Sequence, residues 1–83
     1  MKRSEVIQII NQFLIDEIEV EDNQIKEEAR LKEDLGIDSL DFVDVVVIVE
    51  REFGFKIKAE EMASVKTLSD FYNYISQKVN ERK

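Results

Sequence analysis

The segment from Leu40 to Phe53 is the most apolar part of this chain, and the only two glycines of the sequence, Gly36 and Gly54, lie on either side of it. Gly36 permits a sharp turn before the segment, and Gly54 can end a helix in the left-handed conformation. At about 100° per residue, one arc of the segment carries an apolar cluster, which predicts a helix packed on a core. The cluster consists of Phe42, Val45, Val46, Val49 and Phe53, with Ile48 at its margin.

The same segment carries a second apolar stripe on the opposite side, made of Leu40, Val43 and Val47. A helix that is apolar on two faces is either buried on both or keeps one face for a partner. With 83 residues, the chain has room for one domain and one modest core. We therefore expect a single domain spanning residues 1–83, in which this stripe faces solvent until a partner covers it.

The N-terminal residues have the spacing of an amphipathic helix from Ser4, the expected N-cap, to about Ile18. The connection from Glu19 to Asp38 has scattered apolar positions and no sustained period, which predicts a long ordered loop. A loop of this length is unusual in a small domain and indicates a functional or topological reason. The apolar face of the first helix consists of Val6, Ile9, Ile10, Phe13 and Leu14.

Two helices are predicted after Gly54, a short one at residues 60–64 and a longer one that opens at Thr67. Thr67 and Asp70 have the spacing of a capping box, in which each side chain bonds the backbone N–H of the other residue. The tail at residues 80–83 is expected to be frayed. The buried face of the last helix is expected to consist of Leu68, Phe71, Tyr72, Ile75 and Val79, with Tyr74 at its edge.

The composition argues against several classes of function. The chain has no cysteine and no histidine, so it lacks disulfides, thiolate metal ligands, the commonest strong nucleophile and the commonest general base. Nineteen acidic against twelve basic residues give a formal net charge of -7, which would repel nucleic acid and anionic membranes. No apolar run approaches the ~20 residues of a membrane span, and the N-terminus lacks the apolar segment of a signal peptide. We expect a cytoplasmic protein that binds no nucleic acid.

Ser39 lies between two acidic positions at the start of the apolar helix. Asp38 is a good N-cap residue, and Asp41 three positions later can complete a capping box. Ser39 would then point outward from the first turn, where unpaired N–H groups and the helix dipole favour a phosphate esterified to its hydroxyl. Serine is also common in first helical turns without any such role, so the local pattern alone leaves both interpretations open.

A longer pattern distinguishes these interpretations. Residues 34–41, with the sequence Asp-Leu-Gly-Ile-Asp-Ser-Leu-Asp, and the helix end at residues 50–57 resemble the acyl carrier proteins. The resemblance implies an all-α fold, a small right-handed bundle of three longer helices and one short helix with a long first loop. It also implies that Ser39 carries 4'-phosphopantetheine, taken from coenzyme A and attached through a phosphodiester, and that Asp38 helps to position the serine for the modifying transferase.

The resemblance implies a carrier and not an enzyme. The thiol of the arm would hold acyl intermediates as thioesters for fatty-acid, polyketide or lipid-precursor synthesis. Acids near Ser39 would meet basic patches on the phosphopantetheinyl transferase and on the enzymes that load, elongate and transfer acyl groups, and the carrier is expected to be a monomer. The expected docking face consists of Leu40, Asp41, Val43, Asp44, Val47, Glu50 and Arg51.

Two positions depart from the usual pattern of that family. Phe42 stands where a smaller residue is common, and we expect it to shrink or reshape the internal cavity that shelters acyl chains. Arg51 stands where an acid is common, so it brings a positive charge to the docking face and implies partners different from those of the principal fatty-acid carrier. The acids of this region lack the ligand spacing of a calcium loop, so no structural metal site is predicted.

Two alternatives stay open. The motif fixes the arm but not its cargo, which could be an amino acid or another non-fatty acyl group. An unmodified acidic helical adaptor could use the same two-faced helix without an arm. A mass increase of one phosphopantetheinyl group, after incubation with a transferase and coenzyme A, would distinguish a carrier from an adaptor.

Overall fold

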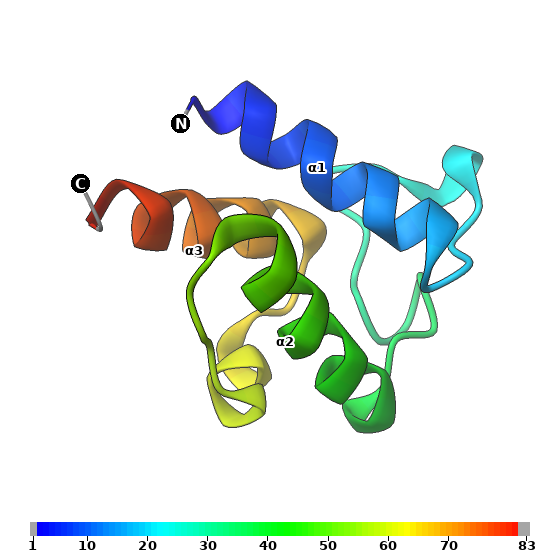
Figure 1. The fold of residues 1–83 in the computed structure, drawn as a ribbon. Coiled ribbons are helices and arrows are strands. Elements are labelled where there is room, and N and C mark those ends of the chain that lie inside the picture. Colours follow the sequence, from blue (N-terminus) through cyan, green and yellow to red (C-terminus); the bar gives the residue numbers. More distant parts are fainter. Residues whose placement is uncertain (1, 82–83) are drawn as a thin grey trace.

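Three α-helices make up most of the structure, a computed structural model that describes residues 2–81 apart from the side chain of Ala59. The helices are α1 (Arg3–Asp16), α2 (Ser39–Phe53) and α3 (Leu68–Glu81), and two short 3-10 segments are η1 (Asp22–Gln24) and η2 (Ala59–Ser64). This part of the chain contains no strand, so the all-α prediction is confirmed at that level. In Figure 1, α1 and α3 lie side by side and run in opposite directions, and α2 lies in front of α3.

The first helix starts earlier than predicted. Its N-cap is Lys2, whose backbone N–H donates to a carboxylate oxygen of Glu5 over 3.1 Å. The prediction of Ser4 as N-cap is wrong, because this bond across three residues starts the helix upstream and leaves Ser4 inside the first turn. The helix also ends earlier, at Asp16 and not near Ile18. Its buried face consists of Val6, Ile10, Phe13 and Leu14, with Ile9 half-buried beside them.

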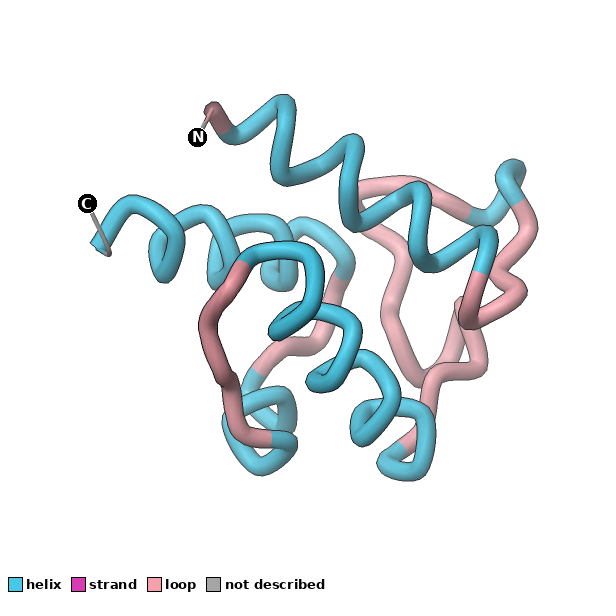
Figure 2. Tube along the Cα trace, viewed as in Figure 1, coloured by secondary structure: helices cyan, strands magenta, loops and turns pink. Residues whose placement is uncertain are grey.

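The predicted long loop joins α1 to α2 and contains only the short η1, as Figure 2 shows. Nonlocal backbone bonds order it: an antiparallel bridge pairs Arg30 with Thr67, and the Leu31 N–H donates to the Lys66 carbonyl over 2.9 Å. Four apolar side chains of the loop are buried and anchor it to the core. They are Val20, Ala29, Leu31 and Ile37.

The buried face of α2 differs from the face that the helical projection predicted. Ile48, predicted at the margin, is buried together with Val45 and Val49. The helix ends at Gly54 as predicted, with φ at 80° in the left-handed region and its N–H donating to the Glu50 carbonyl over 2.9 Å. The rest of the predicted face is only half-buried and consists of Phe42, Val46 and Phe53.

The last helix opens with the predicted reciprocal cap. The Thr67 N–H donates to Asp70 Oδ2 and the Asp70 N–H donates to Thr67 Oγ1, each over 3.2 Å. Its apolar face packs on α1, where the rings of Phe13 and Phe71 meet edge to face with 6.5 Å between their centroids. The buried residues of the predicted face are Leu68, Phe71, Tyr72 and Ile75, while Val79 and the edge residue Tyr74 are half-buried.

Two predictions about the C-terminal third are modified by the structure. Asn80 and Glu81, predicted to be frayed, belong to the helix. Val79 packs against the core and holds this last turn. The remainder of that tail, residues 82–83, lies outside the described residues. The short helix predicted at residues 60–64 is the 3-10 segment η2, whose Met62 is buried against the core.

Candidate functional site

Ser39 is the first residue of α2, and its side chain is exposed. The predicted cap is present on either side of it. Asp38 Oδ1 accepts the N–H groups of Leu40 and Asp41 over 3.0 and 3.2 Å, and Asp41 Oδ2 accepts the Asp38 N–H over 3.3 Å. These bonds fix the first turn of α2, so the hydroxyl-bearing residue is presented by a rigid element.

The residues just before Ser39 shape the turn that delivers it. Asp34 Oδ2 accepts the backbone N–H of Arg30 over 2.8 Å, and this bond is the main reason why the pKa of Asp34 is lowered from its usual value. Gly36 has φ at 70°, a conformation that favours glycine. The first acid of the motif and its glycine are therefore explained by backbone geometry.

A pocket of about 310 Å³ lies beside Ser39, between the long loop, the start of α2 and η2. Phe42 is half-buried in its wall, one turn along α2 from the serine. The effect of Phe42 on a sheltered acyl chain stays a prediction. The lining consists of Leu31, Lys32, Glu33, Ile37, Asp38, Ser39, Phe42, Met62, Ala63, Val65 and Lys66.

The apolar stripe of α2 faces solvent, as predicted. Leu40 is 78% exposed, Val43 55% and Val47 59%. Two acids of the expected docking face, Asp44 and Glu50, are exposed on the same helix. Asp41 is half-buried because it takes part in the cap. The structure therefore brings the expected docking residues together on one helix next to Ser39, and their role in docking stays a prediction.

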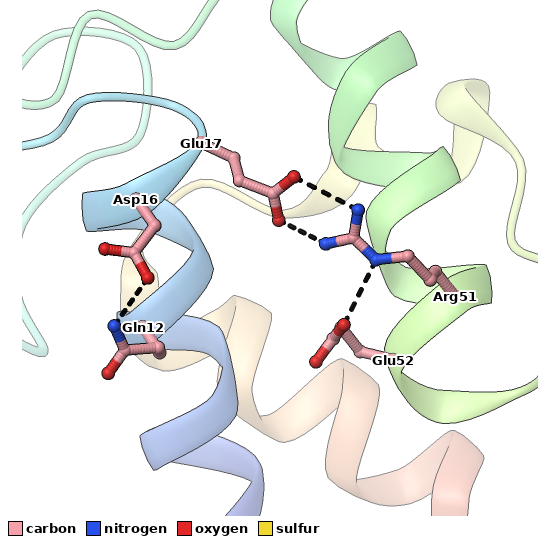
Figure 3. Close-up of polar contacts among 5 residues, drawn as sticks. All are labelled: Gln12, Asp16, Glu17, Arg51 and Glu52. Carbon is pink, nitrogen blue, oxygen red and sulfur yellow. Dashed lines mark hydrogen bonds and ion pairs between the residues drawn. The ribbon is translucent and has the colours of Figure 1, made fainter.

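Arg51 is engaged within the protein. As Figure 3 shows, its guanidinium reaches from α2 to the end of α1, where both terminal nitrogens donate to the Glu17 carboxylate, one of them over 3.1 Å. Its Nε donates to Glu52 over 3.1 Å. These bonds, chiefly those to Glu17, raise the pKa of Arg51 above its ordinary value. Sequence reasoning missed this pairing because Glu17, the C-cap of α1, is distant from Arg51 in the sequence.

Lys32 and Lys66 are the other residues of the site that sequence reasoning missed. They line the pocket beside Ser39 but lie on different loops. No local spacing connects them; their two segments are joined by the Arg30–Thr67 bridge and by backbone bonds such as that from the Leu31 N–H to the Lys66 carbonyl. Among residues 2–81, no group of three or more acidic side chains is arranged to hold a metal ion.

Comparison with known proteins defines the class of this protein. A family model described as "Phosphopantetheine attachment site" matches residues 8–75, a range that includes Ser39 and all of α2. The chain is 36% identical over 77 residues to a protein named "Acyl carrier protein" from Thermotoga maritima, a match covering 93% of this chain and 95% of the relative. A protein of the same name from Thermosynechococcus vestitus is 35% identical, with 95% of this chain and 98% of that protein covered.

A third relative, "Acyl carrier protein" of Phytoplasma mali, is 36% identical, with 90% of this chain and 89% of that protein covered. The chain therefore belongs to the acyl carrier protein family, and the resemblance found in its sequence is confirmed. In the described part of the chain, no helix has the length and apolar character needed to cross a membrane.

Proposed function

We propose that this protein carries acyl intermediates as thioesters on a 4'-phosphopantetheine arm attached to Ser39. The observation that supports this most is the exposed serine on the capped first turn of α2, beside a pocket and inside the range matched by the family model. The arm supplies a terminal thiol, which this cysteine-free chain lacks. The protein itself catalyses nothing, and its cargo belongs to fatty-acid, polyketide or lipid-precursor synthesis.

Attachment requires that Ser39 Oγ form a bond to the phosphorus that carries pantetheine in coenzyme A. The pyrophosphate bond of coenzyme A breaks, adenosine 3',5'-bisphosphate leaves, and the serine proton passes to a base of the transferase. Asp38 supports this step by holding the first turn through its bonds to the Leu40 and Asp41 N–H groups. Its contribution is to position the serine, since its accepting oxygen is already used by the helix.

The docking face extends from this site along α2. Leu40, Val43 and Val47 are exposed, and their burial in a partner groove would contribute binding energy. Asp44 and Glu50 would steer the approach of basic patches on the transferase and on the acyl-handling enzymes. An apolar stripe flanked by acids fits the apolar core and polar rim that are typical of protein interfaces.

The finer features of the fold belong to the same proposal. Residues 1–83 form one carrier domain, a right-handed bundle in which η2 takes the place of the short helix between α2 and α3. The protein works as a monomer in the cytoplasm. The relatives from Thermotoga maritima and Thermosynechococcus vestitus cover 93% and 95% of this chain in one match, which supports the single domain.

The proposal is tested by intact mass after incubation with a broad-specificity phosphopantetheinyl transferase and coenzyme A. Wild type should gain the mass of one phosphopantetheinyl group, and Ser39→Ala should gain nothing. Alanine forms helix well and Asp38 still caps, so Ser39→Ala should cost about 1 kcal/mol of stability or less. The matched control is Ser4→Ala, which removes an exposed serine from the first turn of α1 and should leave modification intact.

A wild-type protein that is folded but never modified would favour the acidic adaptor. Modification of Ser39→Ala would move the attachment point to another serine. The mass of the loaded protein from its native cell would distinguish a fatty acyl cargo from an amino acid or another acyl group.

A further inference from the structure

The phosphodiester of the proposed arm would lie in an unfavourable electrostatic setting. It carries a negative charge, Asp38 and Asp41 flank Ser39, and the whole chain has a formal net charge of -7. The helix terminus offers fewer unpaired donors than the sequence predicted, because the Asp38 carboxylate already takes the N–H groups of Leu40 and Asp41. Cationic side chains outside α2 would therefore add to what the helix dipole still contributes.

The backbone fixes two lysines near this position. The Leu31 N–H donates to the Lys66 carbonyl over 2.9 Å, next to the bridge between Arg30 and Thr67. The Ile37 N–H donates to the Leu31 carbonyl over 2.8 Å, and the chain continues from Ile37 through the cap to the serine. Since Leu31 and Ile37 are both buried, this register is held by the core.

Lys32 follows Leu31 directly, so the same register places Lys32 and Lys66 on two neighbouring loop segments beside Ser39. Both lysines are exposed and line the pocket that Ser39 lines. Within residues 2–81, neither ammonium group is in an ion pair with a carboxylate. Glu33 also lines the pocket, so its rim carries charges of both signs, with the two lysines free to meet an anion.

We propose that Lys32 and Lys66 hold the phosphodiester on Ser39 between their ammonium groups and thereby position the start of the arm over the pocket. This inference rests on the proposed function, because it needs the arm on Ser39. Each ammonium is a flexible point charge with three donors, suited to the two unesterified oxygens of a phosphodiester. Such charge-assisted bonds would offset the repulsion from the acids around Ser39. The two lysines are positioning residues and take no part in thioester chemistry.

The test uses holo-protein and the phosphorus NMR signal of the arm. Wild type, Lys32→Gln, Lys66→Gln and the double variant are modified to completion, and the mass of each is checked. A phosphate held by two lysines tumbles with the protein, so the double variant should show about a twofold slower transverse relaxation of the phosphorus signal and a changed chemical shift. Each single variant should give a signal between those of wild type and the double variant. Lys66→Arg should give the wild-type signal, because the charge at position 66 is kept.

The matched control removes two lysines that do not line this pocket, Lys26 and Lys56. The double variant Lys26→Gln with Lys56→Gln has the same net charge as the test variant and should keep the wild-type phosphorus signal. Raised ionic strength should move the wild-type signal toward that of the test variant, since these exposed charges are screened.

The outcomes separate the two proposals. A wild-type protein that gains no arm overturns the proposed function. A modified wild type whose phosphorus relaxation and shift equal those of the Lys32 and Lys66 double variant overturns only the role of the lysines. Equal changes in the test and control variants would mean that net charge alone acts on the phosphate, which also overturns it.

Discussion

The pair of helices α1 and α3 differs from α2 in what its apolar side chains contact. The pair is apolar on one face and buries that face, with Phe13 against Phe71 and the Tyr72 hydroxyl bonded to Asn11. α2 buries one face and leaves three large apolar side chains exposed on the other. The pair thus holds the fold, while α2 both completes the core and presents Ser39 with an uncovered surface.

The largest expected effect separates the two faces of α2. Val49 is fully buried, so Val49→Asp places an unpaired charge in the core and should cost about 4 kcal/mol or more, enough to unfold a domain of marginal stability. Val47 is 59% exposed, so Val47→Asp should change the unfolding free energy by less than about 1 kcal/mol. Urea melts of both variants measure the difference.

The same two variants test docking. Val47→Asp should keep its fold yet slow modification by the transferase and acyl transfer by partner enzymes, because it puts a charge into the apolar stripe. If Val47→Asp unfolds the protein as strongly as Val49→Asp, the stripe is part of the core. A folded Val47→Asp with unchanged transfer rates would place the docking face elsewhere.

A smaller effect is expected where the two regions are joined, at the ion pair of Arg51 and Glu17 in Figure 3. Arg51→Gln removes the pair, and Arg51→Glu places a third carboxylate beside Glu17 and Glu52. Melting temperature should therefore fall in the order wild type, Arg51→Gln, Arg51→Glu. These decreases in melting temperature should be much smaller than that of Val49→Asp, since the ion pair is exposed and screened by water.

The control for this prediction exchanges the charges. Glu17→Arg combined with Arg51→Glu keeps an opposite-charge pair between α1 and α2 and should recover most of the melting temperature lost by Arg51→Glu alone. Raised salt should shrink all of these differences. Equal melting temperatures for Arg51→Glu and wild type at low salt would show that the ion pair adds nothing to the stability of this junction.

The sequence predicted those parts of the structure that local chemistry decides. The Asp38 cap, the Gly54 end of α2 and the exposed side of its apolar stripe each depend on residues within about two turns of one another, and each was found as expected. The N-cap of α1 was misplaced because serine is a better cap by preference than lysine, whereas the bond from Lys2 to Glu5 decided the position.

The missed features depend on segments that are distant in the sequence. The helical projection placed Arg51 among the docking acids and contained no information on Glu17, which lies at the end of α1. Lys32 and Lys66 line one pocket because backbone bonds, among them that from the Leu31 N–H to the Lys66 carbonyl, join their two segments. Both features need the relative placement of elements, which periodicity and capping rules do not contain.

The smallest expected effect is a pH dependence at the contact between η2 and α3. Glu61 Oε1 accepts the Tyr74 hydroxyl over 2.7 Å and lies 3.8 Å from Lys78 Nζ. The Tyr74 bond is the main cause that lowers the pKa of Glu61 below its ordinary 4.5. Because the folded pKa is depressed, the stabilisation is complete above the unfolded pKa near 4.5 and is lost as pH falls through the folded pKa.

Removing the Tyr74 hydroxyl should therefore matter most near neutral pH. We expect Tyr74→Phe to lower the urea midpoint there, and the gap to wild type should narrow as pH falls below the folded pKa of Glu61, since a neutral carboxyl makes a weaker bond. Tyr72→Phe is the matched control within the α1 and α3 pair, because its hydroxyl bonds the amide of Asn11, which does not titrate. The difference in urea midpoint between Tyr72→Phe and wild type should stay constant over the same pH range. If the difference between Tyr74→Phe and wild type is also constant, the ionisation of Glu61 does not hold η2 against α3.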